Sequence, residues 1–296
     1  MSIKVEKVCK NYGSQQVLDK VSFNINSGQI VGFLGPNGAG KSTMMKIITG
    51  YITDFEGTVE LEGLDVRKSA IETKKMIGYL PENNPLYLDM YVKEYLQFVA
   101  QSYGLGKNSN ARVDEMIQKT GLTHEYKKKI GQLSKGYRQR VGLSQALIHD
   151  PKVLILDEPT TGLDPNQVVD VRNLIIQVGK EKTVMLSTHI MQEVKAICQR
   201  VMIINKGHLV ADDNQSMLSE TLKFIVETEN QIDSKDFYSI SGVTNVIALS
   251  ANVVEIQAVE DIRSEIFRYA LEKGLMIKTL KQKEQNMEEV FRELTR

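Results

Sequence analysis

The chain has 296 residues, enough for one large domain or for a large domain with a smaller neighbour. Its 37 Lys and Arg balance 37 Asp and Glu to a formal net charge of +0, so no global field favours nucleic acid or anionic lipid. No apolar run approaches the roughly 18 residues of a membrane span, and residues 1–7 lack the apolar core of a signal peptide. Because Cys9 and Cys198 are isolated, we expect a cytosolic protein without a disulfide framework or a CxxC zinc site.

Short runs of alternating hydrophobicity open the chain at residues 3–8 and 21–25, with Tyr12 between them. They predict antiparallel strands with one buried face. The apolar run at 29–34 predicts a further strand, and residues 42–49 predict a helix that ends at Gly50. Strands are also predicted at 58–61 and 77–80.

Between the strand at 29–34 and the helix at 42–49, the chain fits the phosphate-loop pattern G-x-x-x-x-G-K-[ST]. Its glycines allow backbone N–H groups to turn toward phosphate oxygens, and the helix directs its positive end at the same anion. Lys41 is predicted to reach the β- and γ-phosphates, and the Ser42 hydroxyl to ligate Mg²⁺. The expected nucleotide-binding residues are Gly35, Pro36, Asn37, Gly38, Ala39, Gly40, Lys41, Ser42 and Thr43. The sequence therefore predicts a protein that binds a nucleoside triphosphate.

Residues 84–149 have helical rather than strand spacing of apolar positions, with helices predicted at 92–103, 111–120 and 137–148. The core pattern resumes with strands at 152–156, 183–187, 200–204 and 208–211, and with helices at 168–178 and 190–198. Strands that alternate with helices predict a doubly wound α/β sheet, here interrupted by a helical insertion. Beyond residue 216, strands at 224–226 and 253–256 and helices at 261–272 and 286–294 predict a small α+β lobe.

Two adjacent carboxylates, Asp157 and Glu158, follow the strand at 152–156. Because successive strand residues point to opposite sides, the two acids can take different roles. Asp157 is expected to hold Mg²⁺, and Glu158 to orient or deprotonate the attacking water. Acids end many apolar strands without a function, but a phosphate loop upstream favours the catalytic interpretation.

The stretch Leu133-Ser134-Lys135-Gly136-Tyr137 resembles the LSGGQ signature of the ATP-binding cassette (ABC) family, with Lys135 and Tyr137 replacing one glycine and the glutamine. A phosphate loop followed by a helical insertion and this signature distinguishes ABC ATPases from other P-loop proteins. The resemblance covers residues 1 to about 215. It implies a P-loop (RecA-like) cassette at 1–215, with an antiparallel β subdomain and an insertion at about 84–149, and an accessory lobe at 216–296.

The resemblance also implies roles for residues outside the phosphate loop. Tyr12 stands at the family's adenine-stacking aromatic, His189 at its switch histidine, and Asp164 in its D-loop. Glu82 stands at the Q-loop glutamine, a contact to Mg²⁺ and water, where a carboxylate keeps an oxygen ligand but adds a charge. The plainer alternatives are a packing aromatic, a structural histidine and an exposed loop carboxylate.

A dimer is implied as well, in which two cassettes enclose two ATP molecules between the phosphate loop of one and the signature of the other. Ser134 and Gly136 open a helix whose positive end would then meet the γ-phosphate bound by the second copy. A homodimer that binds ATP and Mg²⁺ is therefore the expected working form.

The Glu82 variant, the run at 80–92 and the ending at 287–295 are similar to ATPases of ABC-2 type exporters. The run at 80–92 most resembles the gliding-motility-associated (GldA-type) members. This resemblance implies an ATPase on the inner face of the cell membrane that drives a separate ABC-2 permease, touches the membrane only through it, and binds no nucleic acid.

Two other functions stay open at this point. A soluble ABC ATPase of translation or DNA maintenance would have two cassettes, long coiled coils or zinc modules, none of which the sequence contains. A regulatory module without turnover would not need Glu158 and His189.

Overall fold

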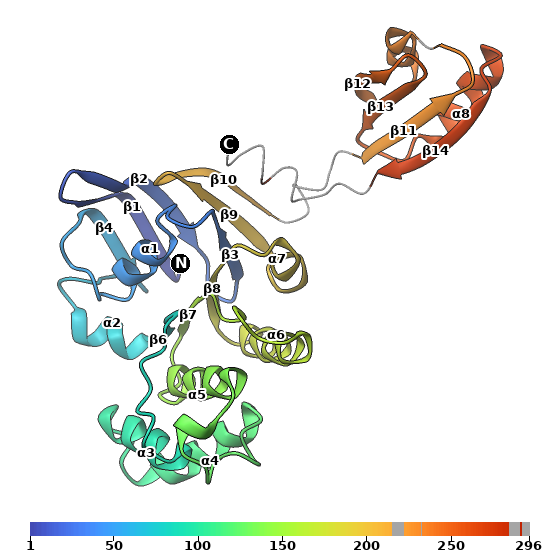
Figure 1. Cartoon of the computed structure of the whole chain (residues 1–296). Helices are drawn as coiled ribbons and strands as arrows, with labels where there is room; N and C mark the ends of the chain where they lie inside the picture. Colours follow the sequence, from blue (N-terminus) through green and yellow to red (C-terminus); the bar gives the residue numbers. More distant parts are fainter. Residues whose placement is uncertain (215–221, 232, 284–290, 292–296) are drawn as a thin grey trace. The chain divides into compact units, whose positions relative to one another are not determined.

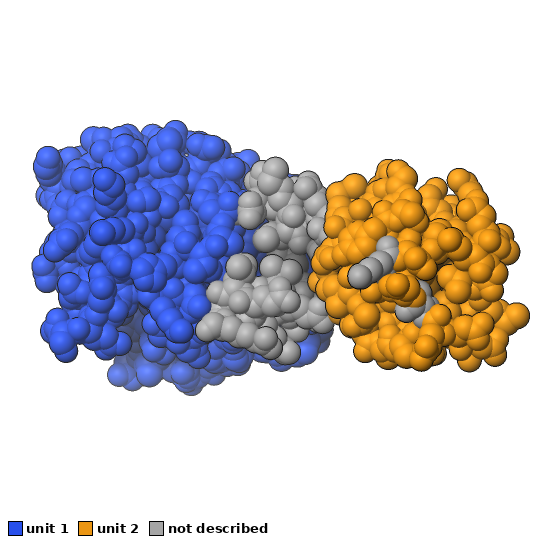
Figure 2. All heavy atoms as spheres, turned by 90° about the horizontal axis from the view of Figure 1, so that it is seen from above, with its two compact units in different colours: residues 1–213, 295 blue, residues 214–294, 296 orange. Residues whose placement is uncertain are grey.

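The computed structural model describes residues 1–214, 222–231, 233–283 and 291. Residues 1–213 form one compact unit, and the described residues from 214 onward form a second, coloured separately in Figure 2. Apart from Phe291, the predicted helix at 286–294 lies outside the described residues, as does the predicted boundary at 215/216. Within the described part of the chain, no helix has the length and apolarity needed to cross a bilayer.

A six-stranded sheet organises the first unit, and its strands follow the order β10-β9-β3-β8-β7-β6. The strands are β10 (His208–Asn214), β9 (Arg200–Asn205), β3 (Ile30–Leu34), β8 (Thr183–Thr188), β7 (Val153–Asp157) and β6 (Ile77–Leu80). Every residue of β3, β7 and β8 is buried, as expected for apolar strands covered on both faces. The pairs from β9 through β3, β8 and β7 to β6 are all parallel, so the carboxyl ends of five strands share one edge.

A second, antiparallel sheet packs on the other side of helix α1 (Lys41–Ile48), in the order β2-β1-β4-β5 (Figure 1). Its strands are β2 (Gln15–Ile25), β1 (Ile3–Tyr12), β4 (Glu56–Leu61) and β5 (Leu64–Asp65). Met44, Met45, Ile47 and Ile48 of α1 are fully buried in the core that joins the two sheets. The α/β class, the parallel sheet and the antiparallel subdomain are thus confirmed, while helix α2 (Ala70–Met76), which buries only Thr73, was not predicted.

Three helices form the predicted insertion: α3 (Val92–Ser102), α4 (Ser109–Lys119) and α5 (Lys135–Leu147), grouped below β6 and β7 in Figure 1. Helix α5 begins two residues earlier than predicted, because the Ser134 hydroxyl caps it by accepting the Tyr137 N–H. At its other end, the Arg112 guanidinium donates to the carbonyls of Leu147 and Ile148. Beyond the insertion, α6 (Pro165–Gly179) and α7 (Met191–Ile197) complete the first unit.

The second unit contains an antiparallel sheet of order β12-β13-β11-β14, an α-helix and the short 3-10 helix Ser234–Ser239. Its elements are β11 (Leu222–Thr228), β12 (Val243–Ser250), β13 (Val253–Ala258), α8 (Arg263–Glu272) and β14 (Ile277–Lys283). It has its own core, in which Phe224, Ile256 and Ile266 are fully buried. The sequence did not indicate β12 and β14, because these edge strands bury too few apolar side chains to show alternation.

Candidate functional site

A cavity of about 470 Å³ opens where the carboxyl ends of the parallel strands meet. Open α/β sheets bind ligands at this edge. The structure brings together ten of the predicted site residues there: Tyr12, Asn37, Gly38, Gly40, Lys41, Ser42, Thr43, Glu82, Glu158 and His189. Gly35, Pro36 and Ala39 belong to the same loop without lining the cavity.

The phosphate loop runs from the end of β3 to the start of α1, and its glycines are required by its backbone. Gly38 and Gly40 have φ values of +81° and +109°, in the left-handed region that favours glycine. A Cβ atom at Gly35 would lie 2.4 Å from the Ile204 carbonyl oxygen, so no side chain fits there. At Gly38 and Gly40, the loop therefore presents backbone and no side chain to the cavity.

Lys41 begins α1 and is 6% exposed. Its ammonium donates to the carbonyl oxygens of Gly35, at 2.7 Å, and Pro36, at 3.2 Å. Burial lowers the pKa of this ammonium, and the carboxylates of Glu158 and Asp157 partly oppose the shift. The loop carbonyls thus hold a poorly solvated cation at the wall of the cavity, where phosphate oxygens could replace them.

Glu158 directly follows β7 and is buried, with 7% of its surface exposed. Three side chains contact its carboxylate. His189 Nδ1 lies 3.0 Å from both carboxylate oxygens, and the Thr161 hydroxyl donates to Oε2 at 2.9 Å. Lys41 Nζ lies 3.9 Å from Oε1. The φ of Glu158 is +50°, a region that residues with a side chain seldom occupy and that is found at functional sites. A carboxylate fixed in this way can orient a water molecule and accept its proton.

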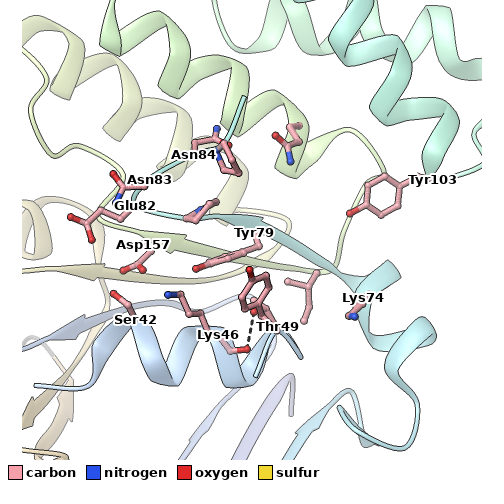
Figure 3. Close-up of a pocket in the computed structure, with 15 residues that line it drawn as sticks. Ser42, Lys46, Thr49, Lys74, Tyr79, Glu82, Asn83, Asn84, Tyr103 and Asp157 are labelled. Atoms are coloured by element: carbon pink, nitrogen blue, oxygen red, sulfur yellow. Dashed lines mark hydrogen bonds between the residues drawn. The ribbon is translucent and has the colours of Figure 1, made fainter. Parts of the chain in front are cut away.

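Asp157, the last residue of β7, is 2% exposed, and its Oδ1 accepts a hydrogen bond of 2.5 Å from the Ser187 hydroxyl. It also lines a second cavity of about 540 Å³, where Ser42, Asp157 and Glu82 lie next to one another at one end (Figure 3). Among the described residues, no three His, Cys, Asp or Glu side chains gather to hold a metal ion. One hydroxyl and two carboxylates instead fit Mg²⁺ that arrives with a triphosphate, because that ion takes few protein ligands and fills its shell with phosphate oxygens and water.

Tyr12 is the last residue of β1 and lies at the rim of the 470 Å³ cavity. Its side chain is 49% exposed, more than the packing alternative would allow. The Lys10 ammonium lies 5.0 Å from the centroid of this ring and forms a cation–π contact with it. An aromatic ring so placed is available for stacking on a base.

The other three predicted residues, Ser134, Gly136 and Asp164, do not line this cavity. Ser134 caps α5, and the Asp164 carboxylate caps α6 by accepting the Gln167 N–H at 2.9 Å. A Cβ atom at Gly136 would lie 2.2 Å from the Gln167 side-chain oxygen, so the two helix starts pack against each other. In one chain, these three residues therefore lie outside the cavity that the phosphate loop lines.

Sequence reasoning gave no role to Thr161, Ser187, Gln15 and Val17, which belong to this site. Ser187 shows why: its hydroxyl accepts the Glu158 N–H and donates to Asp157, because β7 and β8 pair in parallel with Asp157 opposite Ser187. The only available signal was its position at the end of a predicted strand.

Comparisons with known proteins agree with this geometry. Residues 18–161 match the family model described as ABC transporter. The chain is 31% identical over 297 residues to the uncharacterized ABC transporter ATP-binding protein YxlF of Bacillus subtilis, covering 98% of each chain. It is 36% identical to the bacitracin transport ATP-binding protein BcrA of Bacillus licheniformis, covering 79% of this chain and 81% of BcrA. Among solved structures, the dimeric post-hydrolysis state of the ATP-binding cassette MJ0796 bound to ADP and Pi has a TM-score of 0.66 and 25% identity, covering 72% of this chain and 98% of that one.

Proposed function

The chain belongs to the ABC transporter ATP-binding proteins and is an ATPase of that family, and on this premise we propose that it drives a membrane exporter. The observation that carries the proposal is the position of Glu158, held by His189 and Thr161 beside Lys41 of the phosphate loop. Export is favoured because BcrA, a relative at 36% identity, is named for bacitracin transport.

The residues of the site divide the chemistry among them. Backbone N–H groups of the phosphate loop and the Lys41 ammonium bind the triphosphate, and the exposed ring of Tyr12 stacks on the adenine. Ser42, Asp157 and Glu82 hold Mg²⁺, which when bound neutralises charge on the phosphate oxygens. Glu158 accepts a proton from the water whose oxygen attacks the γ-phosphorus, and the bond from that phosphorus to the β-phosphate oxygen breaks. His189 holds the Glu158 carboxylate and contacts the γ-phosphate.

The chain works as a homodimer in this account. Ser134 is exposed at the start of α5, and neither it nor Gly136 lines the cavity of its own chain. A second copy would bring its γ-phosphate to that helix start, with Asp164 at the same interface. The dimeric state of the MJ0796 cassette, at 25% identity, supports this arrangement.

We propose the cavity in Figure 3 as the docking site of the membrane-spanning partner. Lys74 and Tyr79 of the core and Tyr103 and Gln145 of the helical insertion line it, and it extends to Glu82. A partner seated there would reach the nucleotide site at the end of the cavity where Ser42, Asp157 and the loop that carries Glu82 meet. We assign residues 1–213 as the cassette and the second unit as an accessory lobe. As a finer assignment, we propose an ABC-2 permease as the partner at the inner face of the membrane, from the resemblance of Glu82 and of the runs at 80–92 and 287–295. The proposed GldA-type role in gliding motility rests on the run at 80–92 alone.

Co-expression with any multispanning membrane protein that a neighbouring reading frame encodes tests the function. We expect the two proteins to purify together and the partner to change the rate of ATP hydrolysis. A chain that stays in the soluble fraction with an unchanged rate would contradict the exporter assignment.

Glu82 is expected to couple the partner to the nucleotide, because it lines both cavities at the end of β6. Glu82→Ala should lose most partner-stimulated ATP hydrolysis and keep ATP affinity, while Glu82→Gln, which retains an oxygen ligand, should be tolerated. Partner-stimulated rates of both variants are compared with Asp89→Ala, an exposed carboxylate in the same connection. If the partner stimulated ATP hydrolysis by Glu82→Ala as much as by the wild type, the prediction would be wrong and Glu82 would be an exposed loop carboxylate without a coupling role.

The accessory lobe is expected to affect assembly and not ATP hydrolysis, because it has its own core and none of its described residues lines the nucleotide cavity. A chain that ends after residue 213 should bind ATP as the full chain does, and its dimer or its complex with the partner should change in stability. Titration with a fluorescent ATP analogue and co-purification measure the two effects. Loss of ATP binding in a truncated chain that remains folded would place the lobe in the site.

A further inference from the structure

The carboxylate of Glu193 is buried in the first unit, and the site described above does not use it. Glu193 lies in the first turn of α7 and is 2% exposed. A carboxylate in the interior is unfavourable unless hydrogen bonds satisfy its oxygens. Its partners therefore indicate why it is there.

Two threonine hydroxyls donate to this carboxylate, one to each oxygen. Thr160 donates to Oε1, and Thr188 donates to Oε2 at 2.9 Å. Both threonines are buried, with 3% and 0% exposure. The Thr188 hydroxyl also accepts a hydrogen bond from the Ile190 N–H at 3.0 Å, so this hydroxyl both donates and accepts. Glu193 thus joins segments that lie 33 and 5 residues away in the sequence.

Each threonine belongs to a segment that carries a residue of the reaction. Thr160 lies in the turn after β7, which closes through a hydrogen bond from the Thr161 N–H to the Glu158 carbonyl at 3.3 Å. Thr188 is the last residue of β8 and immediately precedes His189. Because His189 Nδ1 lies 3.0 Å from the Glu158 carboxylate, the two anchored segments meet again at that pair.

We propose that Glu193 is a positioning residue that fixes Glu158 against His189 by anchoring the turn after β7 to the end of β8. Glu158 needs such an anchor because its backbone has a φ of +50° and would relax if the turn were free. Ser187 holds the backbone N–H of Glu158, and Glu193 holds the other end of the same turn through Thr160. The inference depends on the role proposed for Glu158, since positioning matters only if that carboxylate acts on water.

The test is a set of variants of the full chain in which kcat, KM for ATP and thermal stability are measured together. Displacement of a reacting group by about 1 Å can cost ~10²-fold in rate, so Glu193→Ala should lower kcat by ~10²-fold with KM unchanged. Thr160→Val, which keeps the shape and removes one hydroxyl, should lower kcat in the same direction, and Thr160→Ser should restore it. Glu181→Ala, which makes the same change at an exposed glutamate outside the site, is the matched control.

The outcomes separate positioning from a structural role. If kcat falls while KM stays unchanged, and serine rescues position 160, the proposal holds. Equal losses of stability and ATP affinity without a selective fall in kcat would overturn it, as would wild-type kcat in Thr160→Val or in a folded Glu193→Ala. If Glu193→Ala does not fold, Thr160→Val and Thr160→Ser decide alone. An inactive Glu158→Gln beside an active Glu193→Ala would refute only this inference, whereas an active Glu158→Gln would refute the proposed catalytic role itself.

Discussion

Replacement of Glu158 by glutamine is expected to lower kcat for ATP hydrolysis by ~10²-fold or more and to leave ATP binding intact. Glutamine has the shape of glutamate, and its side-chain oxygen can still accept the Thr161 hydroxyl. It cannot accept a proton from water at neutral pH. Lys41 and Ser42 keep their positions, so the triphosphate still binds. The lost rate corresponds to about 2.7 kcal/mol or more of transition-state stabilisation, since each tenfold is about 1.36 kcal/mol.

Steady-state phosphate release and equilibrium binding of ATP, measured on the same preparation, check this result. Glu181→Gln makes the same chemical change at an exposed position and should behave as wild type. If Glu158→Gln turned over near the wild-type rate, Glu158 would have no part in the reaction.

Ser134→Asp is expected to lower ATP hydrolysis by ~10²-fold or more through the second copy of the chain. Aspartate caps a helix as well as serine does, so α5 and the fold should be retained. Its carboxylate would, however, meet the γ-phosphate bound by the other copy, and the start of α5 would repel the anion it is proposed to bind. Loss of one oriented donor at a charged oxygen already costs ~10²-fold in rate. ATP binding to the phosphate loop of the same chain should not change.

Ser134→Thr is the matched control, because it keeps both the cap and the hydroxyl and should retain activity. Sedimentation in the presence of ATP shows whether the Asp variant fails at dimer formation. A Ser134→Asp chain that hydrolyses ATP at the wild-type rate would remove the signature from the site.

The sequence was sufficient where chemistry depends on neighbours along the chain. The phosphate loop carries its glycines, Lys41 and Ser42 in one run between a strand and a helix, and Asp157 and Glu158 directly follow an apolar strand. Each motif includes its own structural context, so the α/β fold and the residues around the 470 Å³ cavity could be predicted together.

Contacts that depend on strand order and register could not be predicted from neighbours along the chain. The hydrogen bond from Ser187 to Asp157 spans 30 residues and exists because β8 pairs with β7 in one particular register. The bond from Thr160 to Glu193 spans 33 residues and needs α7 to pack over the same edge. A serine or threonine in the sequence does not by itself indicate a hydrogen bond to a site carboxylate, because both residue types are common at turns.

The most direct test of the central claim is the mass of Glu158→Gln in solution, measured by light scattering with ATP, with ADP and without nucleotide. The account predicts two chains with ATP, one chain in the other two conditions, and one chain with ATP once Ser134→Asp is added. The same mass in all of these conditions, at ATP concentrations that saturate the site, would contradict an ATP-closed dimer.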